Sequence, residues 1–110
     1  MENSCRLAYI KSMRRDDVIA KLKETEPALR GFGVAALYLF GSHARDEANS
    51  ESDVDVFIDV APGAAFGLRP YIGAFDTLKQ AVGENVDYGT RKGLHPLLRS
   101  EIEREAIRIF

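Results

Sequence analysis

The sequence predicts an α+β fold, in which a small, mixed and strongly twisted sheet of three or four strands carries helices packed on one side. Two apolar stretches, residues 37–40 and 53–60, have the β-branched and aromatic residues of strands. Two others, from residue 16 onward and over 70–82, repeat apolar residues at the spacing of a helix. A chain of 110 residues has the length of one domain with one core.

The composition is that of an ordinary globular protein, with 45% hydrophobic and 29% charged residues. The formal net charge of −2 argues against a nucleic-acid groove, which needs a basic patch. Cys5 is the single cysteine and cannot form an internal disulfide, which fits a reducing cytoplasm. Because the sequence shows no signal peptide and no apolar run long enough to span a membrane, we expect a cytoplasmic protein without a membrane partner.

Residues 1–15 show a weak pattern and are interpreted as an N-terminal extension, which leaves 16–110 as the domain. A helix is expected to begin near Asp16, because Asp16 and Asp17 suit the positive end of a helix dipole. Pro27 must disturb that helix or begin a new first turn. The apolar stripe of this region consists of Val18, Ile19, Leu22 and Leu29.

Two strands are expected on either side of a polar loop. The stretch 37–40 is short and aromatic-rich and ends at Gly41, as a buried strand does. The stretch 53–60 alternates strictly between two sets of side chains, so one face of this strand packs on a core. The other face begins with two carboxylates side by side, those of Asp53 and Asp55.

The paired carboxylates predict a cation site. Like charges repel, so a fold rarely gathers Asp53 and Asp55 on one face without a cation, and Mg²⁺ prefers carboxylate oxygens. Gly41 and Ser42 follow the first strand and open a short expected helix over 42–47, whose backbone amides favour a phosphate group. The sequence therefore predicts an anion site beside a cation site, at neighbouring strand ends.

A helix over 70–82 and a strand over 84–90 are expected next. In the strand, Asp87 faces away from its neighbours, so its carboxylate can lie beside Asp53 and Asp55 if the two strands pair. Gly83 is the expected helix stop between them. The apolar stripe of the helix consists of Tyr71, Phe75, Leu78 and Val82.

The last expected element is a helix whose first turn contains Pro96. Glu105 belongs to its charged outer face, where acids can pair with arginines of the same helix. The apolar inner stripe of this helix is expected to extend almost to the last residue and consists of Leu98, Ile102, Ala106 and Ile109.

The Gly-Ser pair at 41–42 is followed, after ten residues, by the Asp-Val-Asp run at 53–55. This spacing resembles the signature of the DNA polymerase β-like nucleotidyltransferases. More narrowly, residues 39–45 and 52–55 are similar to minimal nucleotidyltransferase (MNT) domains, the antitoxin partners of HEPN-type ribonuclease toxins. The resemblance covers about residues 16–110.

The resemblance implies a Mg²⁺-dependent nucleotidyltransferase that uses ATP, with two Mg²⁺ ions that bridge the attacking and leaving oxygens. It also implies a role for each residue of the motif. Arg91 and Lys92, at the end of the last expected strand, either steer ATP or form a solvated basic turn. The implied metal-binding and catalytic residues are Asp53, Asp55 and Asp87, and the implied ATP- or phosphate-binding residues are Gly41, Ser42 and Arg45.

The resemblance further implies an antitoxin that transfers AMP from ATP to a tyrosine of a HEPN toxin, releases pyrophosphate and forms a hetero-oligomer with that toxin. Two alternatives stay open: a non-catalytic antitoxin that inhibits by binding, and a small-molecule (antibiotic) nucleotidyltransferase. A chain of 110 residues is expected to lack the second domain that encloses a small molecule, which favours a protein acceptor. Asp46 stands where this family usually has glycine, which affects the turn and adds a negative charge beside the phosphate site.

Overall fold

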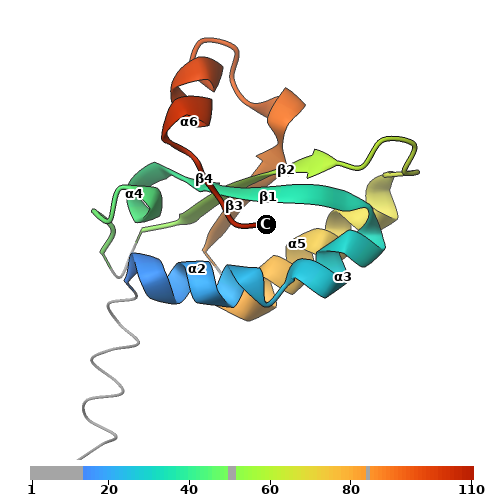
Figure 1. Ribbon diagram of the computed structural model, residues 1–110, viewed down its shortest axis with the longest axis horizontal. Helices are drawn as coiled ribbons and strands as arrows, with labels where there is room; N and C mark the ends of the chain where they lie inside the picture. The colour runs from blue at the N-terminus through green and yellow to red at the C-terminus, as the bar shows by residue number, and fades with distance from the viewer. Residues whose placement is uncertain (1–13, 50–51, 84) are drawn as a thin grey trace, which may run out of the picture.

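The computed structural model describes residues 14–49, 52–83 and 85–110, and the predicted α+β class is confirmed (Figure 1). A single four-stranded sheet has the order β3-β2-β1-β4. The β1 strand pairs antiparallel with β2 and with β4, whereas β2 and β3 run parallel, so the sheet is mixed. The strands are β1 (Val34–Phe40), β2 (Val54–Val60), β3 (Val86–Thr90) and β4 (Ile107–Arg108).

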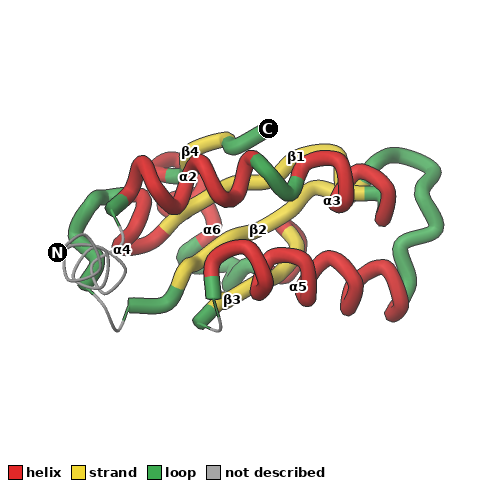
Figure 2. The backbone as a smooth tube through the Cα atoms, turned by 90° about the horizontal axis from the view of Figure 1, so that it is seen from below, coloured by secondary structure: helices red, strands yellow, loops and turns green. Residues whose placement is uncertain are grey.

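Three helices form a layer beneath the sheet (Figure 1). Figures 1 and 2 show α2, α3 and α5 under one face, whereas the short α6 lies over the opposite face. The helices are α2 (Arg15–Lys23), α3 (Glu26–Phe32), α4 (Gly41–Ala44), α5 (Leu68–Val82) and α6 (Arg99–Glu105), with a 3₁₀ turn η1 (Arg91–Gly93). No helix within the described ranges has the length and apolar content needed to cross a membrane.

The first predicted helix is two helices, because Pro27 begins a new turn instead of continuing the old one. Pro27 occupies the first turn of α3, where a missing N–H costs nothing. Between the helices, the buried Thr25 donates its hydroxyl to the Leu22 carbonyl at 2.6 Å. Gly33 then ends α3 with φ 104°, a left-handed conformation that glycine adopts without strain.

The predicted alternation along β2 separates two different faces. Val54, Val56 and Ile58 are buried in the core that the sheet shares with α2, α3 and α5. On the opposite face, Phe57 is also buried, because the Tyr38 ring stacks on it with centroids 4.7 Å apart. Phe57 therefore divides that face between Asp55 on one side and Asp59 on the other.

The last predicted helix is wrong at its C-terminal end. Helix α6 ends at Glu105, and β4 follows, with Ile107 opposite Leu39 of β1. The reason is tertiary: β1 has an open edge, and pairing it lets Ile109 reach the core, where its side chain is 5% exposed. The Ile109 N–H donates to the Leu37 carbonyl at 2.8 Å, which satisfies backbone groups that a continued helix would leave unpaired.

We expect Ile109→Ala to lower the free energy of unfolding by about 2–5 kcal/mol, because it removes buried methyl and methylene groups from the core. Urea unfolding followed by circular dichroism measures this change. Arg108→Ala, at the exposed neighbouring position of β4, is the control and should change the free energy by about 0.5 kcal/mol or less. Equal effects of the two substitutions would contradict a core role for Ile109.

Candidate active site

Strand pairing gathers the predicted carboxylates at one end of the sheet. The parallel register of β2 and β3 places Asp55 directly beside Asp87. Asp53 immediately precedes β2 and is exposed, as Asp87 is. In the antiparallel register of β1 and β2, Phe40 lies opposite Asp55, so the chain enters Gly41 at the same end of the sheet.

Gly41 is required at this position for two reasons. Its φ of 76° lies in the left-handed region, which L side chains rarely adopt. A Cβ atom there would also overlap Oδ2 of Asp55, because the carboxylate lies against the backbone of this turn. The missing side chain of Gly41 therefore makes room for Asp55, in addition to any room that it leaves for a phosphate.

Burial and neighbouring charges perturb Asp55. The pKa of the Asp55 carboxyl is raised to about 6, chiefly because the group is partly buried and also because of the charges of Asp87 and Asp53, while Arg45 acts in the opposite direction. Asp87 also acts on Asp55 through a side-chain hydrogen bond. The carboxylates thus form one electrostatic unit, in which Asp87 affects Asp55 more than Asp53 does.

The Gly-Ser turn continues into α4, which ends in a left-handed residue. Asp46 has φ 59°, its N–H donates to the His43 carbonyl at 3.2 Å, and the Glu47 N–H donates to the Ser42 carbonyl at 2.9 Å. This pair of bonds is a Schellman motif, which usually has glycine at the left-handed position. Asp46 therefore adopts the left-handed turn at the end of α4 despite its side chain.

Arg45 is engaged by two carboxylates in this structure. Its Nε donates to Glu47 at 3.0 Å, and its Nη1 donates to both oxygens of Glu105 at 3.2 and 3.3 Å. Glu105 also accepts the Gly41 N–H at 3.2 Å. Sequence analysis assigned Glu105 to the outer face of α6 and missed this contact, which joins residues distant in the chain.

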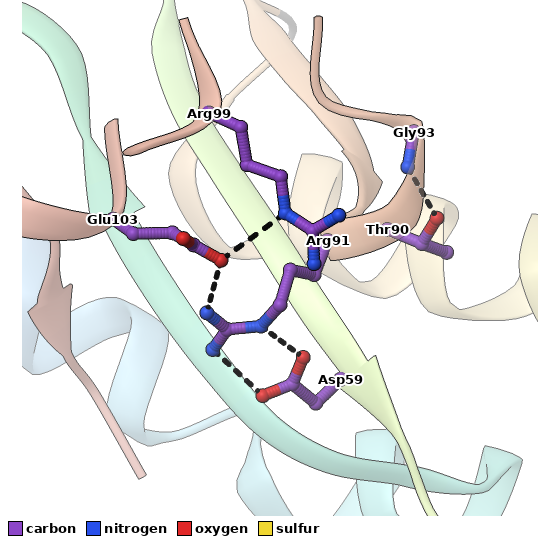
Figure 3. Close-up of polar contacts among 6 residues, drawn as sticks. All are labelled: Asp59, Thr90, Arg91, Gly93, Arg99 and Glu103. Carbon is purple, nitrogen blue, oxygen red and sulfur yellow. Dashed lines mark hydrogen bonds and ion pairs between the residues drawn. The ribbon is translucent and has the colours of Figure 1, made fainter. Parts of the chain in front are cut away.

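A second polar cluster, around Arg91, lies farther along the same face (Figure 3). Arg91 binds Asp59 through two hydrogen bonds of 2.7 and 2.9 Å and donates to Glu103 at 2.7 Å. Its guanidinium carbon lies 4.9 Å from the ring centroid of Tyr38 and 5.0 Å from that of Phe57. Arg91 is therefore a packed structural residue that attaches α6 to the sheet, and not a residue of a solvated basic turn.

A family model described as a nucleotidyltransferase domain matches residues 16–109. The chain belongs to this nucleotidyltransferase family. Two relatives from Methanocaldococcus jannaschii, each described as a “putative protein adenylyltransferase”, are 32% and 31% identical to it. The first alignment covers 76% of this chain and 88% of the relative, and the second 69% and 77%.

A solved structure described as a “putative minimal nucleotidyltransferase” resembles this domain, with a TM-score of 0.73 and 29% identity. The superposition covers 86% of this chain and 95% of the other. The α+β fold with its four-stranded mixed sheet thus matches a known nucleotidyltransferase architecture. Membership in the family implies a nucleoside triphosphate substrate and a divalent metal ion.

The carboxylates of this nucleotidyltransferase fit a hard divalent cation by their donor chemistry. Asp55 and Asp87 lie in register and repel each other, which a cation between their oxygens would relieve. Within residues 14–49, 52–83 and 85–110, no three histidine, cysteine or acidic side chains already converge into a metal site. The Asp55–Asp87 pair therefore provides the starting point of a cation site, and Asp53 is the third carboxylate at the same strand end.

The raised pKa of Asp55 in this nucleotidyltransferase predicts a dependence of stability on pH. Because the folded chain holds the Asp55 proton more tightly than the unfolded chain, stability should fall as pH rises from about 4 to about 6. Asp55→Asn should lose less stability over this window. Thermal unfolding at about pH 4.5 and about pH 7.5 tests this, with the exposed Asp76→Asn as control. A variant that loses more stability than the wild type would contradict the shift.

Proposed function

We propose that this domain is a Mg²⁺-dependent protein adenylyltransferase, which transfers AMP from ATP to a hydroxyl group of another protein and releases pyrophosphate. The observation that carries the proposal is the shared strand end, where pairing brings Asp55 against the Gly41 backbone and Asp87 beside Asp55. The descriptions of the two archaeal relatives as adenylyltransferases of proteins support the choice of nucleotide and of acceptor class.

In the proposed reaction, the acceptor oxygen forms a bond to the α-phosphorus of ATP, and the bond from that phosphorus to the bridging oxygen of pyrophosphate breaks. Asp53, Asp55 and Asp87 would hold the Mg²⁺ ions, and the bound metal would neutralise charge that develops in the reaction. Asp87 assists the removal of the acceptor proton. Ser42 donates its hydroxyl to the departing phosphates, Gly41 leaves room for them, and Arg45 adds positive charge nearby.

A protein surface is the acceptor that the exposed site suits best. Asp53 and Asp87 are exposed, so a hydroxyl presented on a large partner can reach them without entering a closed pocket. We propose that the partner is a HEPN-type ribonuclease toxin and that AMP on its tyrosine disables it, which makes this domain an antitoxin. Support for this finer step comes from the motif at residues 39–45 and 52–55.

One observation favours a second candidate function. The described side chains contain no ready-made group of three metal ligands, as expected if the domain inhibited its toxin by binding alone. A binding role, however, needs neither of the features that Gly41 shows, a left-handed backbone angle and a side-chain position occupied by Asp55. Enzymatic transfer is therefore our first proposal, and occlusion is the outcome that experiments must separate from it.

The catalytic role of the carboxylates predicts the behaviour of a double variant. Asp53→Ala with Asp55→Ala should abolish AMP transfer, and a metal chelator should do the same to the wild type, because both remove the cation site. Incorporation of labelled ATP measures transfer, and circular dichroism checks the fold. Asp76→Ala, which removes an exposed acid of α5, serves as control and should leave transfer unchanged. Normal transfer by the double variant would refute the proposed roles.

Covalent inhibition and occlusion differ after the domain is removed. A HEPN ribonuclease incubated with this domain, ATP and Mg²⁺ should carry added AMP on a tyrosine after repurification under denaturing conditions. Once refolded, that ribonuclease should stay inactive, whereas a sample treated with the Asp53→Ala, Asp55→Ala double variant should recover activity. Mass spectrometry and a ribonuclease assay measure the two results. Unmodified toxin that recovers full activity would assign the domain to inhibition by binding.

A further inference from the structure

The contact between Glu105 and the Gly41 turn connects the last helix with the proposed active site. One oxygen of Glu105 accepts the Gly41 N–H at 3.2 Å, and both oxygens accept hydrogen bonds from Nη1 of Arg45. Its side chain is 29% exposed, less than that of Arg45, which is 46% exposed. Glu105 therefore binds the two ends of α4 at once, from an element that contributes no residue to the predicted motif.

Sheet pairing holds Glu105 at this position. In the antiparallel register of β1 and β4, Ile107 lies opposite Leu39. Continuing this register by two residues on each strand places Glu105 opposite Gly41. Because Ile109 is buried and its N–H is bonded to β1, the segment that carries Glu105 is anchored in the core immediately after α6.

A second contact, made by Glu103, holds helix α6 against the sheet. Glu103, on the same helix, accepts from Arg91 at 2.7 Å, and Arg91 is bound to Asp59 of β2 (Figure 3). Residues two apart on a helix point in different directions, so Glu103 and Glu105 reach different partners. Helix α6 thus bridges the face of the sheet, from the Arg91 cluster to the Gly41 turn, and Glu105 has little freedom to leave.

Gly41 and Arg45 both act on Asp55, which makes their orientation matter for the site. The Asp55 carboxylate lies where a side chain of residue 41 would be, so it is close to the Gly41 backbone. Arg45 is the positive group that offsets the negative charge around Asp55. Without Glu105, the Gly41 N–H would lose its bond and the Arg45 side chain would lose one of its two carboxylates. The turn that carries Ser42 would then be held less firmly relative to Asp55.

We propose that Glu105 is a positioning residue of this nucleotidyltransferase, which orients the Gly41–Ser42 turn and Arg45 to receive the β- and γ-phosphates of ATP. The proposal rests on the proposed function, because it assigns the phosphates to that turn. Helix α6 and β4 are then part of the active site, although they hold no metal-binding or catalytic residue.

Kinetic and binding measurements on the full chain test this role. In Glu105→Ala, the KM for ATP should rise about tenfold, as expected for a lost charge-assisted hydrogen bond, while kcat changes by less than about threefold. Glu105→Gln keeps an acceptor for the Gly41 N–H and should recover part of the loss. Glu101→Gln removes the same charge from an exposed position of α6 and should match the wild type.

Comparing nucleotides separates positioning from a general loss of structure. Calorimetric binding with Mg²⁺ should show weaker ATP binding by Glu105→Ala and unchanged AMP binding, because AMP lacks the phosphates that the turn receives. An unchanged KM in folded Glu105→Ala, or equal losses for ATP and AMP, would overturn the role. A lower KM would also overturn it, by showing that Glu105 competes with the phosphates.

Failure of the proposed function gives a different pattern. A wild-type chain that binds ATP but transfers no AMP would refute the reaction, and the ATP and AMP binding data would still decide the role of Glu105. A wild-type chain that binds no ATP would overturn both proposals.

Discussion

The close approach of Asp55 to the backbone of Gly41 is the constraint on which the site depends. It requires glycine at a left-handed backbone angle, a β1–β2 register that places Phe40 opposite Asp55, and a positive group near enough to offset the charge of the carboxylates. Each of these comes from a different level of structure: backbone conformation, strand pairing and long-range charge. A one-residue slip of β2 would move Asp55 to the other face and remove the site.

The two faces of the sheet are stabilised by different physics. Beneath it, aliphatic side chains of β1 and β2 pack on α2, α3 and α5, and burial of apolar surface dominates. Above it, Arg91 stacks on two aromatic rings and binds carboxylates from β2 and α6. The upper face thus accommodates charged side chains, which is necessary because it exposes aspartates to the substrate. A fully apolar upper face would leave no place for Asp55.

Local pattern was enough to predict most of the fold, because α5, β2 and β3 each carry their own periodicity and stops. The turn at Asp46 was also foreseen as a special position. The strand at Ile107–Arg108 was not predicted, because the alternation of residues 107–109 also fits the end of an apolar helix stripe. Only the open edge of β1 decides between a strand and a helix here. Glu105 and the Arg91–Asp59 pair were missed for the same reason, because their partners lie far away in the chain.

The pairing of β4 with β1 has a consequence for biosynthesis. Strand β1 is made early, yet its second edge is covered only when residues 107–110 emerge, near the end of the described chain. Until then the nascent chain exposes an unpaired, apolar strand edge, which either a chaperone or another unfolded chain can bind. The contact of Ile109 with β1 also joins residues far apart in the sequence. Closing so long a loop costs conformational entropy, so we expect this contact to form slowly. A partly synthesised chain would then carry Asp53, Asp55 and Asp87 without the strand that completes the sheet.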